Sequence, residues 1–244
     1  MNQTQTVGRA LDILFTLAEE NKSMTVKEIS EKVSIPTSTV YRLIKTLELN
    51  EVVTREPHGE IGLGIKLFSL AQNLYLKVEN DLLGISLPLL KDLTEKLNET
   101  SFLAIKKGDV GVTVQSVEVD RLIRFVAQKG KQHSLTEGAT GKAILAFEKK
   151  NIIDDMLSIH PSIDQVRFFE EVKKICQQGY VKTIGEVDAD TLAIAAPIFD
   201  LNNNVIASIT VAGPKVRFDE DAIDRTIQEI KKATSELTTA LRKL

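Results

Sequence analysis

Apolar residues near the start of the chain recur at the three- and four-residue spacing of an amphipathic helix. The series is Val7, Ala10, Leu11, Ile13, Leu14 and Leu17. The polar stretch 19–23 ends this helix. Thr25 followed by Glu28 is a capping box, in which each side chain accepts from the other residue's backbone amide. A second helix is therefore predicted over residues 26–33.

A third helix is predicted to begin near Pro36, because proline is well suited to the first turn of a helix. Its buried stripe consists of Val40, Leu43, Ile44 and Leu47. Short strands at 52–54 and 61–63 flank Glu56-Pro57-His58-Gly59, a turn sequence that closes a hairpin. Three helices followed by a hairpin predict a winged helix-turn-helix domain over residues 1–64.

The next segment is predicted to be a linker helix over residues 65–80, with apolar residues around much of its circumference. These residues are Ile65, Phe68, Leu70, Ala71, Leu74, Tyr75 and Val78. Such a helix needs more than one neighbour, so we expect it to pack against a second subunit as well. A separate helix is predicted over 86–97, with Pro88 in its first turn.

After residue 98 the pattern changes to short β-rich runs. The predicted strands are 101–106, 111–117, 122–126, 180–184, 192–199 and 205–212. The last two are joined by an Asp-Leu-Asn-Asn-Asn turn, whose residues tolerate positive φ. The predicted helices are 141–149, 165–178 and 219–241. Residues 81–244 are expected to form an α+β domain with a mostly antiparallel sheet and helices packed on one face.

Composition narrows the class of protein. Of the 244 residues, 43% are hydrophobic and 27% charged, which excludes a disordered chain. The apolar runs are far shorter than the ~20 residues that span a bilayer, so no membrane association is expected. The polar N-terminus does not resemble a signal peptide and the single cysteine can form no internal disulfide, so we expect a cytoplasmic location.

The few candidate metal ligands and nucleophiles lie far apart in the sequence. His58, His133 and His160 have no zinc-site spacing, so no metal or other cofactor is expected. His133 and His160 are predicted in loops without partners. Cys176 is predicted to be half-buried on a helix, with no histidine near it in sequence to activate it.

The exposed face of the third helix has the side chains of a DNA recognition helix. Thr37 and Ser38 in the first turn can bond phosphate oxygens, while Tyr41, Arg42 and Lys45 project one and two turns later. The first 80 residues hold 9 Lys and Arg against 10 Asp and Glu, so attraction to DNA must come from this local cluster. A solvated amphipathic helix is the alternative.

The stretch Gly138-Ala139-Thr140-Gly141-Lys142-Ala143 has the composition of a phosphate loop but the wrong spacing. Thr136 stands where the opening glycine should lie, and Ala143 replaces the magnesium-binding Ser or Thr. A glycine-rich turn entering a helix still offers amides to a small anion, and the alternative is a loop that only begins a helix. Glu186, Asp188 and Asp190 alternate in a polar loop and are expected to be solvated rather than catalytic.

Eight short motifs together resemble the IclR family of bacterial transcriptional regulators. Four resemble its winged helix-turn-helix: RALDIL at 9–14, MTVKEIS at 24–30, IPTSTVYRLIKTL at 35–47 and GLG at 62–64. Four resemble its effector-binding domain: SLTEGATGKAIL at 134–145, QGY at 178–180, IAAPIFD at 194–200 and SITVAGP at 208–214. The motifs occur in the family's order and span essentially the whole chain.

The resemblance implies a homodimeric or tetrameric regulator, more often a repressor, that binds a double-stranded operator of two-fold symmetry. The residues expected at DNA are Arg9, Thr37, Ser38, Thr39, Tyr41, Arg42, Lys45 and, on the hairpin turn, His58. The resemblance to the IclR family also implies a GAF-like C-terminal domain that binds a small-molecule effector, commonly a carboxylate. The residues expected there are Ala139, Thr140, Gly141, Thr183, Ala193, Thr210 and Ala212.

This chain departs from the family pattern at two effector positions. Thr183 and Ala193 stand where many members carry an acid and a cysteine, so we expect a less polar pocket and a ligand with an apolar body. An enzyme or catalytic sensor using the C-terminal pocket is the alternative from another class, and it lacks a nucleophile, base and orienting group. A DNA-architectural protein without an effector is a third interpretation.

Overall fold

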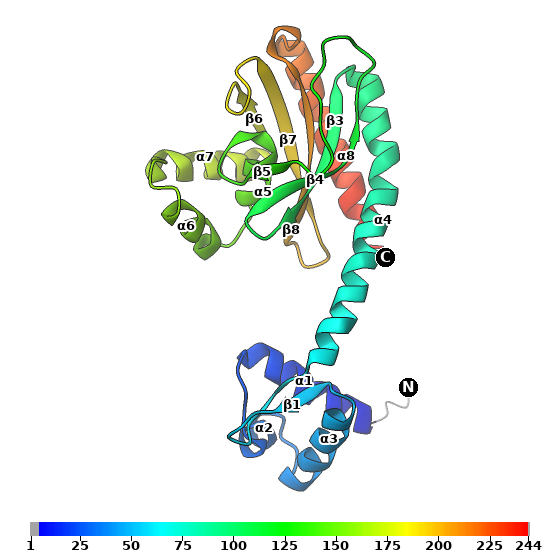
Figure 1. The fold of residues 1–244 in the computed structure, drawn as a ribbon, viewed down its shortest axis with the longest axis vertical. Helices are drawn as coiled ribbons and strands as arrows, with labels where there is room; N and C mark the ends of the chain where they lie inside the picture. Colours follow the sequence, from blue (N-terminus) through cyan, green and yellow to red (C-terminus); the bar gives the residue numbers. More distant parts are fainter. Residues whose placement is uncertain (1–4, 244) are drawn as a thin grey trace. The chain divides into compact units, whose positions relative to one another are not determined.

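The computed structural model describes residues 5–243, with the backbone alone over residues 73–79. The chain divides into two compact units, one ending at Val78 and the other beginning at Glu79 (Figure 1). Each unit is described by itself. The side chains of Leu74, Tyr75 and Val78, predicted to belong to the apolar surface of the linker helix, lie outside the described residues.

The N-terminal unit confirms the predicted winged helix-turn-helix. Its elements are α1 (Gln5–Glu20), α2 (Val26–Lys32), α3 (Thr37–Leu49) and a hairpin of β1 (Val53–Arg55) and β2 (Ile61–Leu63). Both hydrogen bonds of the capping box are present: the Glu28 amide donates to Thr25 Oγ1 at 3.3 Å, and the Thr25 amide donates to Glu28 Oε2 at 2.7 Å. The three helices meet in a small core that includes Ile13, Leu17, Ile29, Val40 and Ile44.

The prediction of two helices between residues 65 and 97 is wrong, because a single helix, α4 (Ile65–Leu97), covers the whole segment. Pro88 removes the hydrogen bond to the carbonyl of Gly84. Gly84 is exposed, so water can reach that carbonyl and the loss is tolerated. On either side of Pro88, Leu82 and Leu90 are buried in the same core cluster, and this packing keeps the helix continuous.

The C-terminal unit is built on one antiparallel sheet of six strands in the order β5-β4-β3-β8-β7-β6. The strands are β3 (Thr100–Lys107), β4 (Val110–Val117), β5 (Gln132–Ser134), β6 (Val181–Ile184), β7 (Thr191–Phe199) and β8 (Val205–Pro214). The helices are α5 (Gly138–Leu145), α6 (Lys150–Ser158), α7 (Gln165–Gln178) and α8 (Glu220–Leu241), with a short 3-10 turn at Lys215–Arg217. The predicted α+β class with a mostly antiparallel sheet is confirmed.

Helices cover both faces of this sheet, so the prediction of helices on one face only is wrong. Figure 1 shows α4 and α8 on one side of the strands and α5, with α6 and α7 beyond it, on the other. Successive residues of β7 divide between the two layers: Ile194 and Ile198 pack with α8, and Ala195 packs with α5. A strand buried on both faces is a continuous run of apolar and small residues, as β7 and β8 are.

Three further local predictions are wrong. Residues 122–126 are a loop rather than a strand: Leu122 is 99% exposed, and side chains satisfy two carbonyls, with Thr100 donating to Phe125 O at 2.7 Å and Arg217 to Ile123 O at 3.1 Å. His133, predicted in a loop, lies on strand β5. Neither strand β5 nor helix α6 was predicted from the sequence. The helix predicted from residue 141 already begins at Gly138.

Candidate functional site

The exposed face of α3 projects as the sequence predicts. Tyr41 is 56% exposed, and Arg42 and Lys45 are exposed beside it, while Val40 and Ile44 on the opposite face are fully buried. The remaining residues predicted at DNA are spread over the same unit: Ser38 is exposed, Thr39 and Arg9 are half-buried, and His58 is exposed on the hairpin turn. This surface is polar, basic at two positions, and open to a large partner.

Thr37, which is exposed and predicted at DNA, also makes a contact within the unit. Ser30 Oγ donates to the carbonyl of Ile35 at 2.6 Å, so the contact of 3.0 Å between Ser30 Oγ and Thr37 Oγ1 needs Thr37 as the donor. A hydroxyl has one proton, and a phosphate oxygen accepts only. In this arrangement Thr37 fixes the turn between α2 and α3, and Ser38 is left as the exposed hydroxyl of the first turn.

The hairpin is tied to the end of the recognition helix. Arg55 donates to Glu48 from Nε at 3.0 Å and from its terminal nitrogen at 3.3 Å, and it also donates to Gly59 O at 3.2 Å. Glu48 is half-buried. The two-pronged ion pair holds the turn that carries His58 at a set distance from α3.

A cavity of 240 Å³ lies in the C-terminal unit between the start of α5 and one face of the sheet. Its wall runs across the strands. One end is formed by Phe102 of β3, Phe125 of the 122–126 loop and His133 of β5, and the other by Thr183 of β6 and residues 186–188 of the loop after it. The full lining is Phe102, Phe125, Lys131, Gln132, His133, Ser134, Glu137, Gly138, Ala139, Thr140, Thr183, Glu186, Val187, Asp188, Thr191, Ala193 and Ala212.

Five of the seven residues predicted at the effector line this cavity: Ala139, Thr140, Thr183, Ala193 and Ala212. Thr183, Ala193 and Ala212 face one another in register across β6, β7 and β8 and form part of its floor. Gly141 and Thr210 do not line it. A Cβ on Gly141 would lie 1.7 Å from the carbonyl oxygen of Ser134, so glycine is needed there for close packing.

The hydroxyl groups of Thr140 and Thr210 share a hydrogen bond of 2.9 Å. The Thr140 carbonyl also accepts from Ser208 Oγ at 3.0 Å, which fixes α5 to β8. Thr183 differs: its residue is 6% exposed, its side chain lines the cavity, and its hydroxyl has no hydrogen-bond partner among the described residues. A hydroxyl that lines a cavity without a protein partner is available to a ligand.

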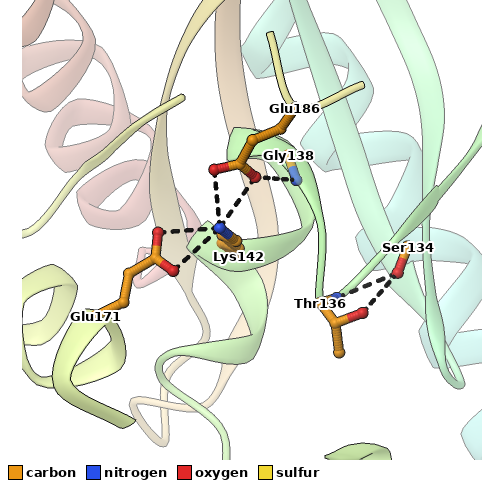
Figure 2. A network of polar contacts seen from close by, with 6 residues as sticks. All are labelled: Ser134, Thr136, Gly138, Lys142, Glu171 and Glu186. Carbon is orange, nitrogen blue, oxygen red and sulfur yellow. Dashed lines mark hydrogen bonds and ion pairs between the residues drawn. The ribbon is translucent and has the colours of Figure 1, made fainter. Parts of the chain in front are cut away.

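Lys142, one turn along α5 from Gly138, lies at the centre of a polar network (Figure 2). Its ammonium is 3.0 Å from both oxygens of Glu171 and 2.9 Å from Glu186, and its side chain is only 10% exposed. Glu186 Oε2 also accepts the amide of Gly138 at 3.0 Å, the first amide of α5. Glu186 is exposed, as predicted for a solvated loop residue. It is also a counter-ion of Lys142 and satisfies one of the amides predicted to bind an anion.

The aromatic end of the cavity could not be read from the sequence. The Phe102 ring stacks on Phe125 at 5.9 Å and on His133 at 5.7 Å between centroids. His133, predicted to have no partner, shares a hydrogen bond of 2.7 Å with Thr113 Oγ1. Burial, helped by the charge of Lys131, lowers the pKa of His133 to about 4, so its imidazole is neutral at physiological pH.

The other candidate reactive groups form no site. Cys176, predicted half-buried, is exposed, donates to the Ala146 carbonyl at 3.0 Å, and has its pKa raised by desolvation, so it is not an activated thiol. In the part of the chain that the structure describes, no three His, Cys, Asp or Glu side chains are grouped as metal ligands. Over the same residues, no helix is both long enough and apolar enough to cross a bilayer.

Comparison with known proteins matches both units to one family. Residues 6–57 match the IclR helix-turn-helix domain, and residues 75–239 match the C-terminal domain of bacterial transcriptional regulator IclR. The chain belongs to the IclR family. The alternative of an enzyme is set aside, because the family consists of transcriptional regulators: the helix-turn-helix domain binds DNA and the IclR C-terminal domain binds an effector.

Individual IclR relatives are similar over nearly their whole length. The HTH-type transcriptional regulator KipR of Bacillus subtilis is 25% identical, with 97% of each chain covered. The transcriptional repressor IclR of Escherichia coli is 27% identical over 98% of this chain and 90% of its own. Among solved structures, an IclR-family regulator from a Rhodococcus species is 26% identical with a TM-score of 0.70, covering 96% of this chain and 92% of that one.

Proposed function

We propose that this IclR regulator binds a two-fold symmetric operator as a dimer and releases it when a small carboxylate occupies the 240 Å³ cavity. Residues 1–64 would contact DNA, residues 65–80 would link the domains, and residues 81–244 would bind the effector. The observation that carries this proposal is the cavity itself, which is lined by aromatic, small and charged residues and by Thr183, whose hydroxyl has no partner among the described residues. Regulation by repression fits such a design.

The DNA-binding proposal rests on the exposed face of α3. Arg42 and Lys45 are exposed there without a recorded ion-pair partner among the described residues, and Tyr41 and Ser38 flank them. Arg9, Thr39 and His58 are kept as proposed contacts at the edges of this face. Because the first 80 residues carry one more acid than base, non-specific attraction to phosphate is weak, and two half-sites are needed for useful affinity.

The dimer proposal rests on apolar residues that this unit leaves uncovered. On α1, Val7, Leu11 and Phe15 recur every fourth residue and are 57%, 43% and 59% exposed. At the start of α4, Ile65 and Phe68 are 72% and 65% exposed. Rows of exposed apolar side chains on helices are typical of protein interfaces. A second copy of the chain is the occupant that the two-fold operator requires.

The effector proposal follows from the two ends of the cavity. The stacked rings of Phe102, Phe125 and His133 favour an aromatic or branched body over a two- or three-carbon acid. The amides of Ala139 and Thr140, in the first turn of α5, have no partner among the described residues and can receive a carboxylate. At 240 Å³ the cavity is below the ~300–1,000 Å³ of drug-sized sites, so a small metabolite fits.

Two measurements on the purified protein test the proposal together. Gel retardation should show sequence-specific binding to DNA from beside its own gene. A thermal-shift screen of small carboxylates should then find one that raises the unfolding temperature, since a ligand at 100 times its Kd adds ~2.7 kcal/mol to the stability of the native state. The same compound should release the DNA. A protein that binds DNA but responds to no compound would be an architectural protein instead.

A further inference from the structure

The charged residues around the cavity do not suit a simple anion. Glu137, Glu186 and Asp188 line it, against Lys131 alone. Glu186 is compensated by Lys142, but Lys142 is shared with Glu171. His133 adds no positive charge, because its pKa is about 4. The lining is therefore negative overall, and a ligand that carries only a carboxylate would meet net repulsion.

Two of these acidic residues, both exposed, belong to segments that meet at the first turn of α5. Glu137 directly precedes Gly138, and its side chain makes no capping hydrogen bond. The loop that carries Asp188 packs against the same glycine: a Cβ on Gly138 would lie 2.7 Å from Val187 Cγ2, and the Gly138 amide donates to Glu186. Neither Glu137 nor Asp188 has an ion-pair partner within the described residues. Over the same residues the carboxylate of Asp188 accepts only the Asp190 amide, at 3.5 Å.

Groups that can bind an anion lie close to Glu137 and Asp188. The amides of Ala139 and Thr140 follow Glu137 in the chain and line the same cavity, at the positive end of α5. The hydroxyl of Thr183, on a residue only 6% exposed, faces this space without a partner among the described residues and can donate or accept. Cation-binding and anion-binding groups are therefore neighbours, while the stacked rings lie at the opposite end of the cavity.

We propose that the effector of this regulator is a zwitterion of the aromatic α-amino acid class. Its ammonium group lies between Glu137 and Asp188, its carboxylate receives the amides of Ala139 and Thr140, and its ring lies toward Phe102. The inference rests on the proposed function, because it takes this cavity as the effector site. The inference adds an ammonium group to the carboxylate effector of the proposed function.

Three probes that share a phenylethyl group test it by calorimetry on the full-length protein. Phenylalanine carries both charges, 3-phenylpropanoate only the carboxylate, and 2-phenylethylamine only the ammonium. We expect phenylalanine to bind at least about tenfold more tightly than either of the others, since each of the others lacks one of its two charged groups and the hydrogen bonds that group makes. Equal or tighter binding of 3-phenylpropanoate overturns the proposal, and so does absence of phenylalanine binding.

Variants then test which carboxylates bind the ammonium group of phenylalanine. Glu137→Gln and Asp188→Asn should each weaken the binding of phenylalanine about five- to tenfold. The affinity for 3-phenylpropanoate should stay unchanged or increase. Glu236→Gln, an exposed substitution on α8 with the same charge change, is the matched control and should alter neither. Unchanged phenylalanine affinity in the double variant contradicts the assignment. If other carboxylates bind in the cavity and release DNA, the proposed function stands while this inference fails.

Discussion

The ammonium of Lys142 lies 2.9 Å from the carboxylate of Glu186, and that carboxylate also accepts the amide of Gly138 at 3.0 Å. One acidic side chain from the loop after β6 therefore fixes both the buried lysine and the first turn of the helix that borders the cavity. Glu171 of α7 contacts the same lysine from the other side. The network joins three segments that are distant in the sequence around one buried charge.

Replacing Lys142 with methionine should destabilise the protein by about 2 kcal/mol. Removal of one partner from a fully buried pair costs ~3–5 kcal/mol, and the cost is lower here because Glu171 and Glu186 are about one-third exposed and can be hydrated. Urea denaturation measures the difference. Lys150→Met, which breaks an exposed pair with Asp154, is the control and should cost under about 0.5 kcal/mol. Equal losses in the two variants would contradict this role for Lys142.

The stability of the protein should depend on His133 between pH 6.5 and 4. The pKa in the folded state, about 4, lies below the ordinary value of 6.5, so the unfolded chain takes up the proton first as the pH falls. The contribution of neutral His133 to the free energy of unfolding is fully present above pH 6.5 and is lost as the pH falls toward 4. Because the ring is partly exposed, we expect a loss of about 1–2 kcal/mol rather than the ~3 of the full shift.

His133→Phe keeps an aromatic ring beside Phe102 and removes the titrating group. Free energies of unfolding measured from pH 7.5 to 4 should fall less steeply in the variant than in the parent protein. The hydrogen bond to Thr113 is lost at every pH, so it changes the level of the curve and not its slope. Parallel curves for the two proteins would show that His133 is not the titrating group.

Arg42→Ala should weaken operator binding by about 1–3 kcal/mol if the guanidinium reads a guanine, and it should relax the sequence preference. The reason is the exposure of Arg42 on the recognition face of α3. Gel retardation with operator and scrambled DNA measures both effects. Arg225→Ala on α8 makes the same charge change away from this unit and should leave the affinity unaltered. An unchanged operator affinity in folded Arg42→Ala protein would remove Arg42 from the interface.

Ala193→Leu should fill the cavity and abolish the effect of the ligand on DNA release, while DNA binding itself is retained. Ala193 lies between Thr183 and Ala212 on the cavity floor, so a longer side chain projects into the ligand space. Calorimetry and gel retardation measure the two functions separately. Ala222→Leu, a half-buried position on α8 that does not line the cavity, is the control. An undiminished ligand response in folded Ala193→Leu protein would place the effector elsewhere.

Leu11→Glu combined with Phe15→Glu should convert the proposed dimer to a monomer and weaken operator binding by at least about tenfold, because charges placed on the proposed apolar interface remove its burial energy. Analytical ultracentrifugation gives the mass in solution. Leu201→Glu, in the β7–β8 turn at 64% exposure, introduces the same charge on an exposed leucine and should leave the assembly intact. A double variant that stays dimeric would show that this face is not the interface.

The sequence determined most of the N-terminal unit. Apolar spacing identifies the buried stripe of α3, a capping box marks the start of α2, and a turn sequence closes the hairpin; each signal is contained within a few neighbouring residues. The exposed recognition residues follow at once, because a helix with one buried face must expose the other. Local periodicity therefore predicts both the fold of this unit and its candidate DNA-binding surface.

Only the tertiary structure formed the cavity that we propose as the effector site. Its aromatic end joins Phe102 and His133 from strands separated by β4, and its polar end depends on how the loop after β6 packs against Gly138. Periodicity tells which side of an element is buried, but not which element covers it. For that reason the sequence could not show that β7 is covered on both faces, that α4 continues through Pro88, or that Glu186 neutralises a buried lysine: each depends on contacts between residues far apart in the chain.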